Sequence, residues 1–190
     1  IGERKTSYQT DSSTTLYTIY LRKNSFNHHS SKMKKLESLF KKLENKIEYS
    51  TVLNPKVSKG SVGWHIEHIL LTTSLIIRTI EKSNPLDYKS KFNFVKMCVF
   101  TLNKIPRGKV QAPNSVRPVE NFSEADIKNN FKTCCNLIDK LPSLKENNFF
   151  VHPFFGHLNL KSSVKFLAIH TKHHLNIIDD ILKAKNGELQ

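Results

Sequence analysis

One segment of the sequence, "VGWHIEHILLTTSLIIRTIEK", constrains the fold more than any other. A helix over residues 62–82 would be apolar around nearly its whole circumference, with only a narrow charged strip at Glu67, Arg78 and Glu81. Ser61 stands where an N-cap is expected. Because such a helix must be surrounded by others, the sequence predicts that it lies in the middle of a helix bundle.

Three other segments show the three- and four-residue apolar spacing of amphipathic helices. They span residues 31 to about 47, about 124 to 141, and about 160 to 184. A shorter helical piece is expected within residues 88–103, ahead of an irregular loop that carries three prolines. Since strand signals are weak, the sequence predicts an all-α fold, a four-helix bundle with long connecting loops.

Local signals mark where these helices begin and end. Ser123 and Asp126 are spaced as in a capping box, and Asn159 can cap the last helix. Pro142 ends the helix before it, and Gly187 lies beyond the end of the last one. The boundaries therefore have support besides the apolar spacing.

The first 32 residues are rich in Ser, Thr and Lys and show no sustained helical period. Met33 resembles a natural start, because a predicted helix follows it directly. We expect residues 1–32 to be an N-terminal extension, disordered or not native to the domain, and residues 33–190 to form one domain. The run "LYTIYL" at 16–21 could still pair as a short strand, and His28 and His29 are given no role.

The formal charge of +14 suggests attraction to nucleic acid or to anionic surfaces. The excess is spread along the chain, however, and arginine occurs only at positions 4, 22, 78, 107 and 117. Readout of base edges favours the planar fork of arginine over lysine. We therefore expect a lysine-rich surface rather than a dedicated nucleic-acid interface.

Three cysteines, Cys98, Cys134 and Cys135, make a disulfide framework improbable, since the adjacent pair cannot easily bridge within a helix. No C-x-x-C pair exists, so the cysteines are expected to be buried apolar residues and not zinc ligands. No apolar run approaches the roughly 18 residues that span a bilayer, and no secretory signal pattern opens the chain. We expect a cytoplasmic protein without a membrane segment.

Three histidines interrupt the apolar face of the last predicted helix. At 100° per residue, His170 and His174 fall at the centre of the apolar stripe, whereas His173 falls near its edge. A spacing of four residues makes the two central rings neighbours. Each buried imidazole needs a polar partner, and an unmet one costs about 1–3 kcal/mol. One divalent cation satisfies both, although two hydrogen-bonded core histidines remain the alternative.

The predicted central helix offers His65 and His68, both away from its charged strip. An imidazole from this helix would complete a three-histidine site and leave coordination positions open for water or substrate. A metalloprotease of the H-E-x-x-H type is disfavoured, because Thr171 stands where that motif carries its glutamate.

Three stretches together resemble the DinB-like (YfiT-like) superfamily of metalloenzymes. They are "GWHIEHILL", "RGKVQAP" and "HPFFGHLNLKSSVKFLAIHTKHHLNII". The similarity covers about residues 33–184 and is closest to a branch of domains of unknown function that carry H-P-x-F-G-x-L before the last helix. It implies a four-helix bundle, often dimeric, in which one histidine of the second helix and an H-x-x-x-H pair of the fourth hold a divalent metal.

Transferred to this chain, that resemblance implies His68, His170 and His174 as metal ligands. The metals of the superfamily are zinc, nickel, iron and manganese. Its characterised members include thiol transferases that use bacillithiol, mycothiol or glutathione, and a maleylpyruvate isomerase. A metal-dependent transferase that joins a low-molecular-weight thiol to a small electrophile is the implied activity, with a homodimer as the implied assembly.

The other histidines have weaker assignments. His65 lies one turn before His68 and is expected to contact the ligands, or to replace His68 as a ligand. His173 and His152 are further candidates for residues that contact the ligands. His152 and His157 bracket "PFFG" within the predicted loop "FFVHPFFGHLN", where a rigid loop fastened by Pro153 is the alternative to a role in lining the site.

Three neutral imidazoles would leave the full charge on the ion, and this charge lowers the pKa of a bound water or thiol. A general base is not identified, because Glu67 is expected to face the charged strip, and Asp179 and Asp180 are expected to be solvated. Lys104, Lys109 and Arg107 could bind an anionic cosubstrate, although a solvated loop is the favoured interpretation.

Two rival functions follow from the same residues. A structural metal-binding module without turnover would need a fourth protein ligand, for which His65 is the candidate. A basic nucleic-acid-binding helical protein would have its histidines merely packed in the core.

Overall fold

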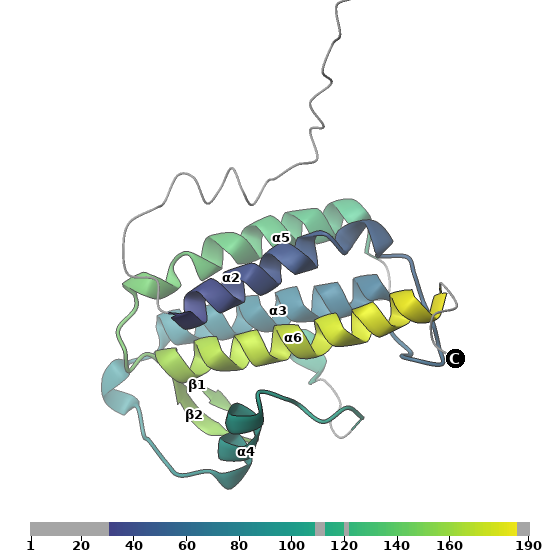
Figure 1. Cartoon of the computed structure of the whole chain (residues 1–190). Helices are drawn as coiled ribbons and strands as arrows, with labels where there is room; N and C mark the ends of the chain where they lie inside the picture. The colour runs from purple at the N-terminus through teal and green to yellow at the C-terminus, as the bar shows by residue number, and fades with distance from the viewer. Residues whose placement is uncertain (1–30, 109–112, 120–121, 186–190) are drawn as a thin grey trace, which may run out of the picture.

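The computed structural model describes residues 31–108, 113–119 and 122–185. Four long helices lie side by side and form most of this part of the molecule (Figure 1). They are α2 (Ser31–Glu44), α3 (Val62–Lys82), α5 (Glu124–Ile138) and α6 (Leu160–Lys185). The all-α prediction is confirmed for the described residues, whose strands form a single small sheet.

The four long helices run in two opposite directions about a shared core, two helices in each direction. In Figure 1, α2 and α6 run from left to right, whereas α3 and α5 run from right to left. α3 packs against both α5 and α6, and α2 packs against α6. The rings of Phe40 on α2 and Phe131 on α5 have centroids 5.9 Å apart. As predicted, α3 is buried along most of its length, since neighbouring elements cover it on several sides.

The predicted caps form as expected. The Oγ of Ser61 accepts a hydrogen bond from the backbone N–H of Trp64, and Ser123 with Asp126 makes a full capping box. At the start of α6, the Oδ1 of Asn159 accepts from the N–H of Ser162 at 3.1 Å. These side chains satisfy backbone N–H groups that have no partner within the helix.

Two helices end earlier than their apolar spacing predicts. α2 stops at Glu44, and Ile47–Tyr49 form a separate 3-10 turn. α5 stops at Ile138, four residues before Pro142, and Leu141–Ser143 form another 3-10 turn. The ring of a proline clashes with the carbonyl four residues before it, which explains why α5 ends at this residue.

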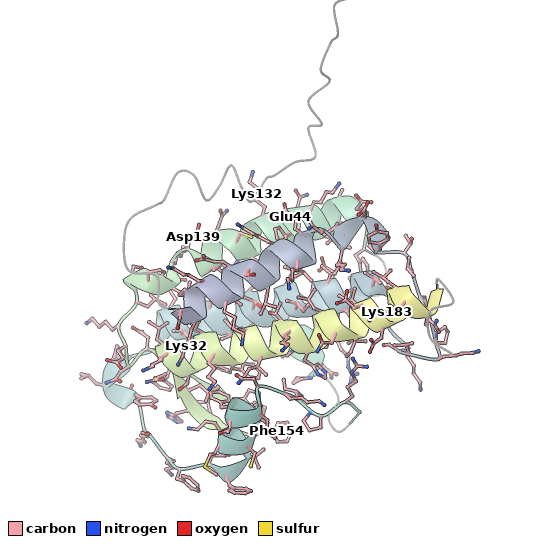
Figure 2. The ribbon with its side chains drawn as sticks, in the orientation of Figure 1. Lys32, Glu44, Lys132, Asp139, Phe154 and Lys183 are labelled. Atoms are coloured by element: carbon pink, nitrogen blue, oxygen red, sulfur yellow. The ribbon has the colours of Figure 1, made fainter. Side chains whose placement is uncertain are left out.

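The segment predicted to be a loop ahead of the last helix is a β-hairpin. β1 (Phe149–His152) pairs antiparallel with β2 (Gly156–Asn159), and Phe150 lies opposite Leu158. Gly156 has φ of 67°, a left-handed conformation that favours glycine at the end of a three-residue turn. Phe154 at this turn is 54% exposed and lies below the four long helices in Figure 2.

One buried asparagine fastens the hairpin to α3. The Nδ2 of Asn148 donates to the carbonyls of Ile80 and Ser83 at 3.0 and 2.9 Å, and its side chain also contacts Ser83 Oγ. The N–H of Phe149 donates to the same hydroxyl at 2.9 Å. The hairpin therefore begins at a fixed distance from the end of α3.

The connection between α3 and α5 contains three short helical elements. These are the 3-10 turns Pro85–Asp87 and Asn114–Val116 (η3) and the helix α4 (Phe94–Leu102). α4 packs beside α6, and η3 packs against α3. α4 begins six residues later than the start of the segment in which a helix was expected. No described helix has the length and apolar character needed to cross a bilayer.

Several predictions fall outside the described residues. They are the extended conformation of "LYTIYL", the assignment of residues 1–30 to an extension, the absence of a role for His28 and His29, the place of Gly187, and the role of Lys109. They stay predictions.

Candidate metal centre

Three histidines predicted to meet do meet, between α3 and α6. His68, His170 and His174 are 5%, 8% and 8% exposed, and one ring nitrogen from each lies within 4.8 Å of the other two. Helix geometry explains the arrangement, because residues 170 and 174 share one face of α6 and α3 packs against that face. The buried cluster could hold a metal ion.

The spacing of one pair of ring nitrogens fits a shared cation. The Nε2 atoms of His68 and His170 are 3.2 Å apart. Two nitrogens bound to one tetrahedral zinc ion at about 2.0–2.1 Å are about 3.3–3.4 Å apart. In the metal-free protein the same separation suits a hydrogen bond between the two rings.

A backbone carbonyl orients the ring of His68. Its Nδ1 lies 2.8 Å from the carbonyl oxygen of Val116 in η3. Because a carbonyl oxygen only accepts, Nδ1 carries the proton and donates it, so Nε2 keeps its lone pair. This is the arrangement in which an imidazole binds a metal through Nε2 while its other nitrogen is held by the protein.

A chain of hydrogen bonds leads from His174 to the surface. The Nδ1 of His174 lies 3.0 Å from the Nδ1 of His65, and the Nε2 of His65 lies 2.9 Å from Ser58 Oγ. If His174 binds through Nε2, its Nδ1–H donates to His65 and the Nε2–H of His65 donates to Ser58. Ser58 Oγ also accepts from the N–H of Gly60 at 3.1 Å. Every polar atom of this chain then has a partner.

The ring of His170 has fewer hydrogen-bond partners than the rings of His68 and His174. Its Nδ1 is buried and has no hydrogen-bond partner among the residues that the structure describes. The ring packs against Phe166 and against the other two imidazoles, with centroid distances from 4.6 to 5.7 Å. Its orientation is therefore set by packing and by the contact with His68 rather than by a polar partner at Nδ1.

The surroundings keep these rings uncharged at neutral pH. Burial lowers the pKa of His65 to about 4, and it holds the pKa of His170 and His174 well below the usual value. Neighbouring imidazoles lower these pKa values further. Burial also lowers the pKa of His68, although the hydrogen bond to Val116 acts in the opposite direction. Neutral imidazole is the form that binds a divalent cation.

Trp64 forms one wall of the cluster. Its ring stacks on His68 with centroids 5.3 Å apart and meets His65 edge-on at 5.2 Å. The residue is only half-buried, so this wall lies between the imidazoles and solvent.

His173 and His152, the other two candidates for contact with the ligands, lie in different parts of the fold. His173 is half-buried at the edge of the face, as predicted, and its ring meets His174 edge-on at 5.0 Å. His152 lies in the hairpin, where its Nδ1 accepts from the N–H groups of Phe154 and Phe155 and its ring stacks on Phe155. Phe166 contacts both His152 and His170, so His152 supports the turn and reaches the cluster only through a phenyl ring.

His157 supports the hairpin as well. Its ring stacks on Phe149 with centroids 4.7 Å apart, and its Nδ1 accepts from the N–H of Lys89 at 3.3 Å. These contacts agree with the rigid-loop alternative for both histidines that bracket "PFFG".

The prediction that Glu67 faces a charged strip is wrong. The residue is 4% exposed, because α5 covers this side of α3. Its Oε2 accepts from Asn130 Nδ2 at 3.0 Å, while its Oε1 is without a partner among the described residues. Burial raises the pKa of this carboxyl, and the hydrogen bond from Asn130 only partly opposes the rise.

The acidic pair near the end of α6 is engaged in ion pairs rather than simply solvated. Asp179 lies 2.7 Å from Lys46, and Asp180 lies 2.7 Å from Arg107. Arg107 is close enough to the cluster that its charge contributes to the lowered pKa values of His65 and His173. Lys104 is exposed in the same loop.

The three cysteines are free, as expected, but Cys98 is only half-buried, whereas burial was expected for all three. Cys134 and Cys135 are buried, and burial raises the pKa of the Cys134 thiol to about 12. Burial also raises the pKa of Cys135. Both thiols therefore stay protonated and apolar in character at neutral pH.

The chain was compared with protein-family models, with curated proteins and with solved structures, and none of them matches. The assignment of this cluster as a candidate metal centre is therefore supported only by the residues and geometry of this chain. The DinB-like resemblance remains an expectation from the sequence motifs.

Proposed function

We propose that this chain is a metal-dependent enzyme with the four-helix-bundle fold of the DinB-like superfamily. The observation that carries the proposal is the buried cluster of His68, His170 and His174, whose ring nitrogens lie within 4.8 Å of one another. The side-by-side packing of α2, α3, α5 and α6 supports the same assignment.

An enzymatic role is favoured over a structural one by the number of ligands. Structural zinc sites are closed by four protein ligands, whereas catalytic sites have three and keep a position open. His65 is the nearest candidate for a fourth ligand, but its two ring nitrogens already contact His174 and Ser58. Three protein ligands therefore account best for the geometry.

A divalent cation at this position would act as a Lewis acid beside a small ligand, and all four metals of the superfamily accept imidazole nitrogen. Protein groups behind the imidazoles fix the orientation of the candidate metal ligands. Val116 and His65 hold the Nδ1 protons of His68 and His174, which aims both Nε2 lone pairs into the cluster. Trp64 limits the access of water on one side.

The reaction that we propose is transfer of a low-molecular-weight thiol to a small electrophile. In this substitution the sulfur forms a bond to the electrophilic carbon while the bond from that carbon to its leaving group breaks, and the thiol proton and the leaving group both pass to solvent. Glutathione and cysteine, among thiols of this class, carry carboxylates. Arg107 pairs with Asp180 near the cluster and has a half-exposed side chain, which supports an anionic cosubstrate.

Metal analysis tests the first half of the proposal. Protein purified without added metal, analysed by inductively coupled plasma mass spectrometry, is expected to contain about one zinc, nickel, iron or manganese ion per chain. His170→Ala and His174→Ala are expected to lose it, while the control His157→Ala, at a histidine in the hairpin, keeps it. Absence of metal, together with salt-sensitive binding of DNA, would support the nucleic-acid alternative instead.

A substrate screen tests the second half. Metal-loaded protein is mixed with glutathione, cysteine or other small thiols and with electrophiles, and loss of free thiol is followed over time. We expect turnover that His68→Ala abolishes. A stoichiometric metal with no turnover and with His65 as a fourth ligand in a crystal structure would assign the site to a structural module.

A further inference from the structure

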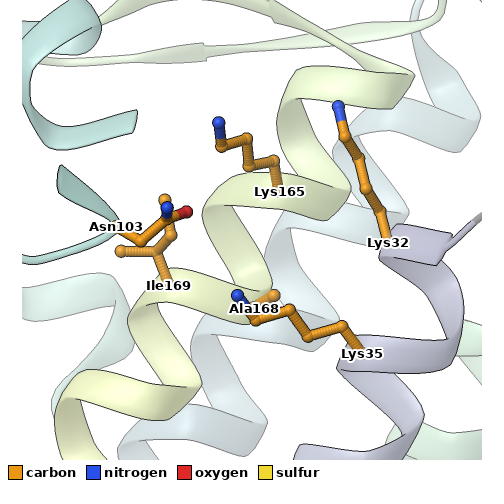
Figure 3. Close-up of a pocket in the computed structure, with 6 residues that line it drawn as sticks. All are labelled: Lys32, Lys35, Asn103, Lys165, Ala168 and Ile169. Carbon is orange, nitrogen blue, oxygen red and sulfur yellow. The ribbon is translucent and has the colours of Figure 1, made fainter. Parts of the chain in front are cut away.

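A groove between α2 and α6 carries an unusual concentration of lysines and lies apart from the histidine cluster. It encloses about 180 Å³ and is lined by Lys32, Lys35, Asn103, Lys165, Ala168 and Ile169 (Figure 3). The lysines come from both helices, and Asn103 comes from the end of α4. Figure 3 shows Lys32 and Lys165 rising on the same side of the groove, while Lys35 reaches across toward Ala168.

The positive charge of this groove is not neutralised by carboxylates. Among the described residues, the ion pairs involve other cations, and none joins Lys32, Lys35 or Lys165 to an acidic side chain. Neither α2 nor α6 has an acidic residue in its first turn, although acidic residues are favoured there. Lys161, in the first turn of α6, adds a further positive charge.

Lys32 lies where burial and neighbouring lysines disfavour its charge. Partial burial lowers the pKa of Lys32, and the charges of Lys161 and Lys165 lower it further. Repulsion of this kind is relieved when an anion lies between the ammonium groups.

The size of the groove selects the kind of anion. Sites for drug-sized ligands enclose about 300–1,000 Å³, so about 180 Å³ suits only a small ligand. Its floor, Ala168 and Ile169, offers no charged group, whereas the lysines offer up to three N–H donors each. We propose that this groove binds a small oxyanion of the phosphate type, held by Lys32, Lys35 and Lys165.

This site is separate from the proposed metal centre. Ala168 and Ile169 line the groove beside α2, whereas His170 contacts His68 on α3. Metal content and phosphate binding can therefore succeed or fail independently.

The test is a titration of the full chain with inorganic phosphate at low salt, followed through backbone amide NMR signals. We expect saturable shifts centred on Ala168 and Ile169. Lys35→Gln combined with Lys165→Gln is expected to weaken binding at least about tenfold, because it removes two of the three ammonium groups that would hold the anion.

The control is Lys132→Gln combined with Lys183→Gln, which removes the same charge from exposed positions on α5 and α6 (Figure 2). This variant is expected to bind phosphate as the unmodified chain does. Equal weakening in both double variants would show diffuse attraction to a basic surface and would overturn the proposal.

A second arm separates the possible sources of phosphate. A soluble phosphate monoester is expected to compete with inorganic phosphate for the same amide signals. Binding to vesicles that contain phosphatidic acid, without saturable binding of either soluble anion, would also overturn the proposal, because it would indicate a membrane-facing surface rather than a small-anion site. Circular dichroism and the unchanged metal content of each variant establish that it has folded.

Discussion

At the scale of single residues, the histidines of the cluster differ mainly in what holds them. The Nδ1 of His68 meets a backbone carbonyl and that of His174 meets another imidazole, whereas the Nδ1 of His170 has no partner among the described residues. Hydrogen-bond partners behind a metal ligand typically change metal affinity 10–100-fold when they are removed. The affinity of the site should therefore depend on residues that never touch the ion.

His65 allows this dependence to be measured. His65→Phe removes the acceptor for the Nδ1–H of His174, and we expect metal affinity to fall about 10–100-fold in competition with a coloured chelator. His65→Asn can place an amide oxygen near the position of the lost Nδ1, so it should restore part of the affinity. Equal affinity in both variants would mean that His65 acts by packing alone.

Glu67 gives a prediction with a definite pH dependence. Burial raises the pKa of its carboxyl in the folded protein, so the ionised form destabilises the fold. The loss of folding free energy therefore grows as the pH rises through the pKa of the folded state. Glu67→Gln should therefore stabilise the protein at pH 8 relative to the unmodified chain and do so much less at pH 4.5. Urea unfolding at the two pH values measures the difference; an effect independent of pH would contradict it.

The three candidate ligands could be predicted from sequence because their spacing and helix assignments are local properties. Ser58 could not, because it lies in a polar loop and meets His65 only after α3 has packed. Glu67 was misplaced for a related reason. Helical periodicity separates the faces of a helix, but it does not show which face a distant helix will cover.

At the scale of secondary-structure elements, the start of α3 depends on a close approach to the preceding turn. The N–H of Gly63 donates to the carbonyl of Ser50 at 2.8 Å. A Cβ at Gly63 would lie 2.8 Å from that carbonyl oxygen and 2.5 Å from the ring of Phe122. Only glycine fits here without displacing one of these neighbours.

Gly63→Ala is therefore expected to destabilise the protein by about 1–3 kcal/mol in urea unfolding, as other overpacked sites do. The higher helix propensity of alanine, worth up to about 1 kcal/mol, should not offset this cost. Thr79→Ala, on the exposed side of the same helix, is the control and should stay within about 0.5 kcal/mol. Equal stability of the two variants would show that the turn adjusts freely.

The helices were predictable because their apolar spacing extends over many turns and their caps are local. The hairpin was not, since each strand has four residues and only one of them is buried, Phe150 in β1 and Leu158 in β2. The alternation of buried and exposed residues that marks a strand cannot be recognised in a segment of four residues. The contacts of Asn148 with Ser83, which fix the hairpin in place, join residues far apart in the chain.

At the scale of the whole molecule, the histidine cluster joins two helices that are separated by 77 residues of sequence. A metal that binds only the folded chain stabilises it by about 2.7 kcal/mol when its concentration is one hundred times Kd. For a chain of this size, that corresponds to a rise in Tm of about 5–10 °C.

Thermal unfolding in a chelator and then with added zinc or nickel should show this rise. The variant His174→Ala should unfold at the same temperature with and without metal. A rise of the same size in this variant would place the stabilising ion elsewhere on the chain.

The hydrogen bond between His68 and Val116 bears on how related sequences should be compared. Its acceptor belongs to the main chain, so any residue that lets η3 adopt the same path can supply it. An alignment could therefore show free variation at position 116 while the contact persists in every member. The length of the connection between α4 and α5, rather than the identity of one residue, would then be the feature that homologues share.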